Sequence, residues 1–104
     1  MNVNFYFHKV DESCKKQIEN YFNKEKLSRV ERLLHHGNAE SAELKVKVEY
    51  FLHHSEFFAK LILNIPRHEV VAEKRSFKLL EALDMALDRL VLQLRKIENI
   101  RHKK

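Results

Sequence analysis

Ten consecutive residues in the middle of the chain alternate between an apolar and a mostly polar set. The two sets are Leu44, Val46, Val48, Tyr50 and Leu52 on one side, and Lys45, Lys47, Glu49, Phe51 and His53 on the other. Successive side chains of a strand point to opposite faces of its sheet, so this pattern predicts a half-buried strand over residues 44–53. A strand with one buried face needs strand neighbours and a layer that covers it.

The remaining residues supply both. Alternation predicts further strands over residues 2–9, 57–65 and 69–74, and Pro66 ends the second of these because proline cannot donate to a strand ladder. Helical spacing predicts a first helix over residues 11–36 with a bend around Asn23, ended by Gly37. A long amphipathic helix is predicted from Ser76 onward, on an apolar stripe of Phe77, Leu80, Leu83, Leu87, Leu90, Leu94 and Ile97. The order β-α-β-β-β-α is typical of an α+β two-layer sandwich, and 104 residues correspond to one domain, residues 1–104.

Composition excludes several kinds of enzyme. The chain has one Gly and one Pro, too few for the glycine loops that cradle phosphates or dinucleotides. A lone Cys14 cannot form an internal disulfide or a thiolate metal cage, and it has no partnered base that would make it a nucleophile. The pairs His35-His36 and His53-His54 point in different directions on a helix or strand, so neither pair closes on one metal ion. We expect no catalytic residue, no metal, no cofactor and no small-molecule substrate.

Two aspartates need separate treatment. Asp84 and Asp88 lie four residues apart on one helix face, where a small hydrolase would place a general acid and a general base. No further catalytic motif accompanies them, and the preferred interpretation is structural. They are expected to pair with strand or loop cations such as Arg67, His68 or Arg75, which would anchor the helix on the sheet.

Positive charge indicates a polyanionic partner. The formal net charge is +5, and residues 95–104 alone hold five Lys or Arg against Glu98, a net of +4. Neutralising phosphates releases condensed counterions, so a few exposed cations bind nucleic acid in a salt-dependent way. The predicted RNA-binding residues are Arg89, Arg95, Lys96, Arg101, Lys103, Lys104, Lys15 and Lys16. For the first helix the alternative is a merely solvated face, because acidic residues there offset its cations.

The uncovered sheet face is a second candidate surface. Tyr6, Phe51 and Phe58 are predicted to point away from the face that carries Val3, Val46 and Leu61. Beside Lys45, Lys47 and Lys60 these aromatic rings can stack on bases. The alternative is a protein–protein adaptor or a self-associating module with Phe51, Phe58 and Ile62 at its centre.

The last helix also resembles a known family. Residues 81–90, followed by Gln93-Leu94-Arg95-Lys96, are similar to the final helix of the ribosome hibernation promoting factor and ribosome-associated inhibitor family (sigma-54 modulation proteins). The strand that ends Leu61-Ile62-Leu63-Asn64-Ile65-Pro66 resembles the third strand of that family. The resemblance implies a four-stranded sheet with two parallel helices on one face, and basic residues toward ribosomal RNA at Arg89, Arg95 and Lys96.

The same resemblance implies a function. It predicts a non-enzymatic translation regulator that binds the small ribosomal subunit and its rRNA, occludes the mRNA and tRNA channel, and acts during starvation or stasis. The chain is expected to be a short-form member that lacks the domain through which long forms join two ribosomes. Without an apolar run that could span a bilayer or a leader-like start, it is expected to be cytoplasmic with no membrane partner.

Overall fold

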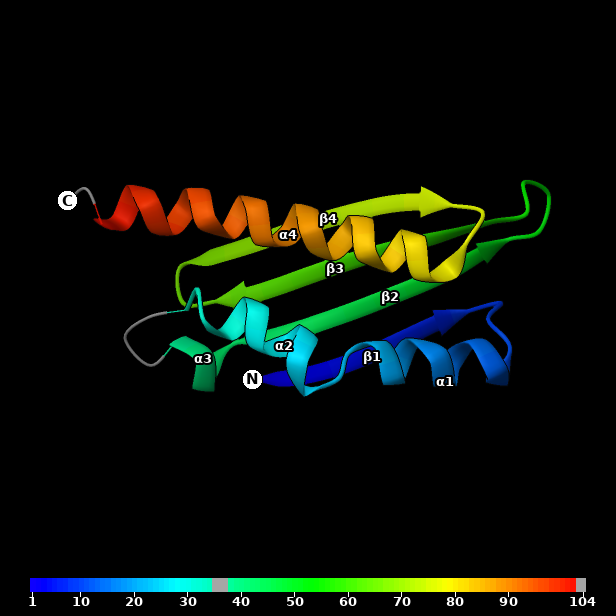
Figure 1. The fold of residues 1–104 in the computed structure, drawn as a ribbon, viewed down its shortest axis with the longest axis horizontal. Coiled ribbons are helices and arrows are strands. Elements are labelled where there is room, and N and C mark those ends of the chain that lie inside the picture. Colours follow the sequence, from blue (N-terminus) through cyan, green and yellow to red (C-terminus); the bar gives the residue numbers. More distant parts are fainter. Residues whose placement is uncertain (35–37, 103–104) are drawn as a thin grey trace.

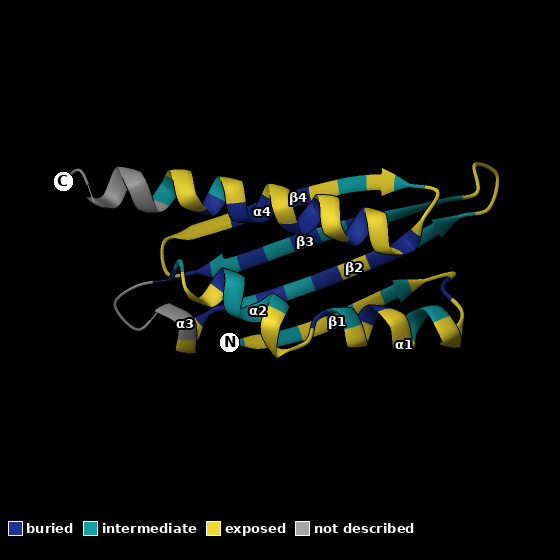
Figure 2. Ribbon diagram, in the orientation of Figure 1, coloured by how far each residue is buried: buried dark blue, intermediate teal, exposed yellow. Residues whose placement is uncertain are grey.

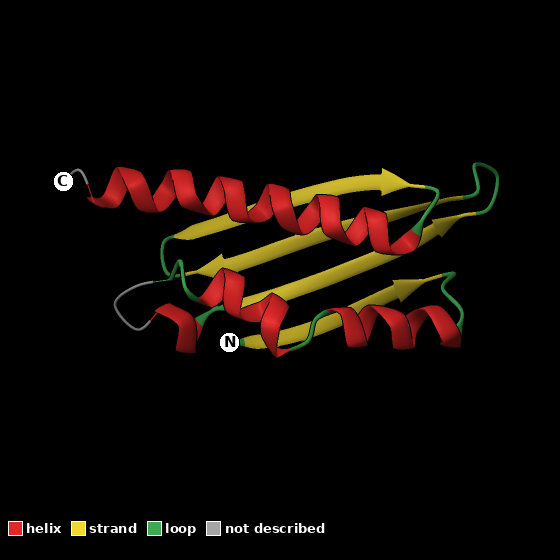
Figure 3. Ribbon diagram, viewed as in Figure 1, coloured by secondary structure: helices red, strands yellow, loops and turns green. Residues whose placement is uncertain are grey.

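The computed structural model describes residues 1–34 and 38–102, and it describes side chains only for residues 1–34 and 40–97. Figure 1 shows a single sheet with helices packed against it, and Figure 3 shows the same view by secondary structure. In chain order the elements are β1 (Asn2–His8), α1 (Glu12–Tyr21), α2 (Lys24–Glu31), α3 (Asn38–Ser41), β2 (Glu43–Phe51), β3 (Glu56–Ile65), β4 (His68–Ser76) and α4 (Leu79–His102). The predicted α+β architecture is confirmed, with the first helix divided into shorter pieces.

The sheet has the strand order β1-β2-β3-β4. β1 runs parallel to β2, whereas β2–β3 and β3–β4 are antiparallel pairs. β4 is longer than the predicted 69–74, because β3 offers a partner along its whole length and Phe57 pairs with Ser76 at the far end. Each strand therefore presents one set of side chains to the core and the alternate set to the open face.

All the packed helices lie on the same face of the sheet (Figures 1 and 2). Val46 and Leu61, two of the strand side chains beneath the helices, have no solvent exposure. The buried apolar residues of α4 that close the core are Leu79, Ala82, Leu83, Ala86, Leu87, Leu90, Val91 and Leu94. Burial of the apolar side chains between the helices and the sheet is the main source of stability. It contributes about 25 cal/mol per Å² of apolar surface removed from water. Within residues 1–34 and 38–102 no helix has the length and apolar character needed to cross a membrane.

The helix predicted over residues 11–36 with a bend around Asn23 is two helices, because the chain is fully interrupted at the predicted bend. α1 ends at Tyr21, and Asn23 adopts an extended conformation from which its side chain accepts a hydrogen bond from the backbone N–H of Lys26 at 3.0 Å. Asparagine at this position satisfies one of the free amides of a new helix, so the chain restarts as α2 with a changed axis. α3 was not predicted, and the predicted terminator Gly37 lies outside the described residues.

The Asn23 cap gives a first testable prediction. Replacing Asn23 with Ala removes the acceptor at the start of α2, and we expect the free energy of unfolding to fall by about 1 kcal/mol. Urea denaturation followed by far-ultraviolet circular dichroism measures this change. An Asn20→Ala variant, altered at an exposed site within α1, serves as the control and should unfold close to wild type. Equal stability of both variants would show that Asn23 does not hold the restart of the helix.

The start of the last helix also differs from its prediction. α4 begins at Leu79, the N–H of Ala82 bonds to the carbonyl of Lys78, and Phe77 precedes the helix with 72% of its surface exposed. Leu80 is 49% exposed, so neither Phe77 nor Leu80 belongs to the buried stripe. The small side chains of Ala82 and Ala86 instead fill that stripe, because they let the helix approach the sheet closely.

Candidate nucleic-acid interface

The cations of α4 occupy two of its sides. Arg89, Arg95 and Lys96 are all exposed, and none of them forms an ion pair with another described side chain. Seven residues make about two helical turns, so Arg89 and Lys96 share one side, whereas Arg95 shares the side of Asp88, which faces α2. Among the described side chains, no carboxylate competes with an external anion for these three guanidinium and ammonium groups. We name them the α4 cations.

Three other predicted RNA-binding residues cannot be placed in the same way. Arg101 falls within α4, but its side chain lies outside the described side chains, and Lys103 and Lys104 lie outside the described residues altogether.

The two predicted cations of α1 differ from each other. The Lys15 ammonium lies 3.2 Å from the Glu12 carboxylate and 5.7 Å from the centroid of the Phe7 ring. Lys16 is exposed and has no contact of this kind in the described part of the chain. An exposed ion pair stabilises the fold by only about 0–1 kcal/mol, so the Glu12 contact weakens Lys15 as a phosphate ligand without removing it.

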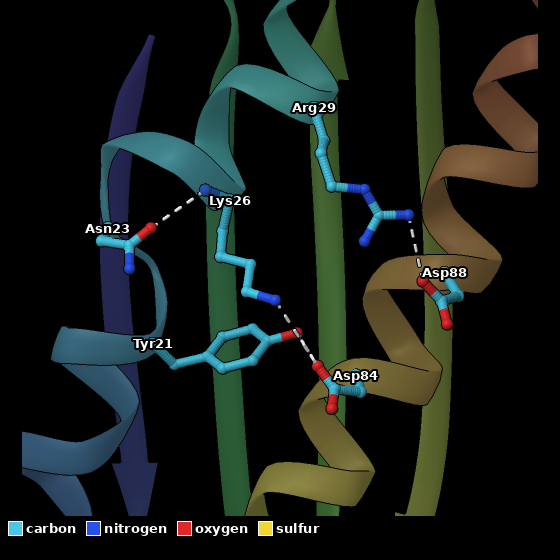
Figure 4. Close-up of polar contacts among 6 residues, drawn as sticks. All are labelled: Tyr21, Asn23, Lys26, Arg29, Asp84 and Asp88. Atoms are coloured by element: carbon cyan, nitrogen blue, oxygen red, sulfur yellow. Dashed lines mark hydrogen bonds and ion pairs between the residues drawn. The ribbon is translucent and has the colours of Figure 1, made fainter.

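A polar bridge joins the first helices to α4 (Figure 4). The Tyr21 hydroxyl donates to Asp84, and the Lys26 ammonium lies 4.0 Å from the same carboxylate. Arg29 donates from Nη2 to Asp88 at 3.1 Å. The Lys26 ammonium also lies 5.0 Å from the centroid of the Tyr21 ring, which brings the phenol, the ammonium and the carboxylate together. We name these five residues the helix bridge.

The helix bridge corrects the predicted partners of the two aspartates. Asp84 and Asp88 pair with groups of α1 and α2, and not with Arg67, His68 or Arg75. The reason is geometric, because the aspartates lie on the side of α4 that faces the neighbouring helices. These contacts are of the structural kind that was predicted, and they join α4 to α1 and α2 on one face of the sheet. Sequence reasoning missed Tyr21 as a bridging residue. The available signal concerned the two cations, because the spacing of Lys26 and Arg29 matches that of the aspartates to within one residue.

The phenol of the helix bridge, Tyr21, has a pKa above its ordinary value. Burial raises the pKa of Tyr21, and the hydrogen bond to Asp84 raises it further. A raised pKa means that the fold favours the neutral phenol. This contribution to stability is full below the ordinary tyrosine pKa of about 10 and is lost as the pH rises through the higher value of the folded state.

A titration tests this arrangement. We expect the phenolate absorbance of the folded protein to include one tyrosine that ionises later than the usual range, and Tyr21→Phe to remove that late step. Tyr21→Phe should also lower the free energy of unfolding at neutral pH by about 1 kcal/mol, the net value of a typical hydrogen bond. Tyr6→Phe, on the open sheet face, should keep the late step. A late step that persists in Tyr21→Phe would contradict the bridge.

The open sheet face carries aromatic and basic side chains together. Tyr6 is 48% exposed with the Lys47 ammonium 5.8 Å from its ring centroid, and Phe51 and Phe58 form an edge-to-face pair at 6.1 Å. The guanidinium of Arg75 lies 5.0 Å from the ring of Phe51 and 5.5 Å from that of Phe58. The predicted orientation of these aromatic side chains is thus confirmed.

The charges on this face are close to balanced. Lys45 lies 3.9 Å from Glu43, and His8 lies 3.9 Å from Glu49. Lys47 and Lys60, by contrast, are cross-strand neighbours without a carboxylate within ion-pair distance among the described residues. Positive charge on this face is therefore local, whereas the described cations of α4 follow Asp88 in the helix.

Cys14, which was considered as a nucleophile, lies in the first turn of α1 beside the carboxylate of Asp11. The backbone N–H of Cys14 donates to the Asp11 carboxylate at 2.7 Å, which lowers the pKa of Asp11, while burial raises the pKa of the Cys14 thiol. A raised pKa disfavours the nucleophilic thiolate. In the described part of the chain no three His, Cys, Asp or Glu side chains come close enough to hold a metal ion.

Comparison with known proteins places this fold. Residues 3–101 match the family described as sigma 54 modulation protein / S30EA ribosomal protein. The N-terminal domain of Protein Y from Thermus thermophilus has a TM-score of 0.71 at 21% identity, over 93% of this chain and 99% of that one. A ribosomal subunit interface protein from Coxiella burnetii has a TM-score of 0.72 at 12% identity, over 95% and 99%. At these identities the likeness is one of fold. No curated protein sequence matches the chain.

Proposed function

The chain belongs to the sigma 54 modulation protein / S30EA ribosomal protein family, and on this premise we propose that it is a non-enzymatic translation regulator. It binds the rRNA of the small ribosomal subunit in the cytoplasm and occludes the channel for mRNA and tRNA. One of the solved proteins that share its fold is a ribosomal subunit interface protein, which supports a ribosomal partner. The action is one of occupancy, with no bond made or broken.

The observation that carries this proposal is the state of the α4 cations. Arg89, Arg95 and Lys96 are exposed and unpaired among the described side chains, although two aspartates precede them on the same helix. Asp84 and Asp88 are engaged by the helix bridge and do not neutralise these cations. A protein that needed these charges only for its own stability would pair them.

The shape of the molecule supports occlusion. Its principal dimensions are 48 × 21 × 21 Å, and α4 runs along the long direction (Figure 1). A narrow rigid body with cations along one helix can lie in a channel that RNA lines, with phosphate contacts fixing its position. The volume of the bound protein then excludes mRNA and tRNA from the channel. The protein needs no direct contact with either of them.

Sedimentation with purified subunits tests this function. We expect the protein to pellet with the small subunit and to displace bound mRNA or tRNA in a competition assay. Affinity should fall steeply between about 50 and 200 mM salt, because each phosphate contact adds roughly 0.7–0.9 to the slope of log K against log salt. Equal binding to both subunits, or binding that salt does not weaken, would contradict the proposal.

The second candidate is a protein–protein adaptor or self-associating module on the open sheet face. Partial exposure of Phe51, Phe58 and Ile62 favours it. The Arg75 guanidinium covers both phenylalanine rings in part, which makes this patch cationic and less suited to an apolar partner. An apolar interface would survive or tighten as salt rises, so the same salt series separates the two functions.

A further inference from the structure

The open sheet face has a hollow of about 290 Å³ that spans β1, β2 and β3. Tyr6 and Phe58 contribute aromatic surface to its lining, and Lys47 and Lys60 contribute ammonium groups. Its lining residues Tyr6, Lys47, Phe58 and Lys60 alternate along the strands with the core-facing set, so the hollow lies on the face of the sheet opposite to the helices. We propose that it is a second nucleic-acid site, which binds one unstacked base of single-stranded RNA together with an adjoining phosphate.

The lysine pair indicates the charge of the ligand. Lys47 and Lys60 are register partners on β2 and β3, so their side chains leave the same face side by side. Like charges directly opposite each other destabilise a sheet, and natural sheets normally avoid or neutralise them. Glu73 is the register partner of Lys60 on β4, yet it forms no ion pair with it. An external phosphate between the two ammonium groups would relieve the repulsion.

The aromatic residues indicate the rest of the ligand. Tyr6 is 48% exposed although it lies on a strand in the sheet, and its ring already lies 5.8 Å from the Lys47 ammonium. Phe58 borders the hollow on β3, and the Arg75 guanidinium lies 5.5 Å from the centroid of its ring. Exposed rings beside cations stack on bases with little preference for sequence, because every base has a π-face.

Size and local charge favour a nucleotide over other occupants. The volume is near the lower end of the roughly 300–1,000 Å³ of small-ligand pockets, so one base fits and an extended peptide does not. Glu49 also lines the hollow, and the His8 side chain lies 3.9 Å from its carboxylate. Duplex RNA hides its base faces, so the ligand is single-stranded.

This second site does not depend on the proposed ribosomal function. It uses residues of the open sheet face, whereas ribosome docking is assigned to the α4 cations. A protein with both sites can contact RNA on its two opposite faces at once, and can hold a loop or a free strand beside the surface that it occupies.

The test uses the isolated protein and a labelled single-stranded oligoribonucleotide, followed by fluorescence anisotropy at low salt. We expect the double variant Lys47→Gln/Lys60→Gln to weaken binding at least tenfold. Tyr6→Leu should weaken it by about fivefold to hundredfold, the range that base stacking gives. The matched control is Lys45→Gln, on the same strand and face but paired with Glu43 outside the hollow, and it should bind as the wild type does.

Several outcomes would overturn the proposal. Wild-type affinity in Lys47→Gln/Lys60→Gln and in Tyr6→Leu would show that the hollow binds no RNA, as would equal losses in Lys45→Gln. Equal binding of a duplex of the same sequence would show that phosphates alone are recognised. If these variants instead convert a dimer into a monomer in sedimentation equilibrium, the face is an interface with a second copy.

Loss of ribosome binding in Arg95 and Lys96 variants, with oligonucleotide binding retained, would separate the two functions.

Discussion

Reversing two of the α4 cations, with Arg95→Glu and Lys96→Glu in one protein, is expected to weaken binding to the small ribosomal subunit well over tenfold. Each substitution removes a phosphate contact and places a carboxylate against the same phosphates, so loss of attraction is joined by repulsion. The slope of log K against log salt should fall by roughly 1.4–1.8, because two phosphate contacts no longer release counterions. Neither residue is buried or paired among the described side chains, so the fold should be unaffected.

A matched control separates this local effect from a change in net charge. Lys74→Glu with Lys78→Glu alters the net charge by the same amount, but near the opposite end of α4 and the strand beside it. We expect this control to lose much less affinity than the Arg95 and Lys96 variant. Co-sedimentation over a salt series measures both proteins. Equal losses would mean that long-range attraction, and not docking at the α4 cations, governs binding.

Truncating Leu90 to Ala is expected to have the largest effect on stability. Leu90 lies on the buried side of α4 and has no solvent exposure. Deleting such a side chain lowers the free energy of unfolding by about 2–5 kcal/mol because a cavity remains. Domains of this size are stable by only about 5–15 kcal/mol, so one substitution removes a large part of the total. With an m-value of about 2 kcal/mol per molar urea, a loss of about 3 kcal/mol lowers the midpoint by roughly 1.5 M.

Leu92→Ala provides the comparison within the same helix. Leu92 is 54% exposed, so the identical change should alter stability by less than about 0.5 kcal/mol. Helix propensity changes equally in the two variants, and the difference between them isolates burial. If Leu92→Ala destabilised the protein as much as Leu90→Ala, the side of α4 that packs on the sheet would be wrongly assigned.

The strands were the most predictable part of the fold. Alternation in β2 fixes which side chains face the core, because a shift by one residue would turn Val46 and Val48 outward. The full length of β4 was not predictable from its own residues. It depends on β3, which supplies a partner as far as Phe57 even where the sequence of β4 turns charged at Lys74 and Arg75.

The helices show where local patterns are insufficient. A stripe of leucines predicted that α4 is amphipathic, but it also included Phe77 and Leu80, whose exposure is set by where the helix begins. Small residues such as Ala82 carry little weight in a hydrophobic pattern, although they decide how close the helix lies to the sheet. The break at Asn23 was visible only as a polar interruption.

The candidate site was predictable in part. Exposure of Arg89, Arg95 and Lys96 follows from their positions on an amphipathic helix, and the structure agrees. The partners of Asp84 and Asp88 could not be derived from sequence, since they depend on how far α2 lies from α4. The hollow beside Lys47 also required the structure, because it is formed by register between strands that are distant in the chain.

The parallel pairing of β1 with β2 bears on how the protein is made. β2, β3 and β4 are joined by short turns, and each can pair with the strand before it as soon as it is synthesised. β1 is translated earlier but has no hydrogen-bonding partner until Glu43–Phe51 has followed it. During that interval the first strand of the nascent chain is unpaired and can pair with another polypeptide. The sheet is complete when β1 pairs with β2.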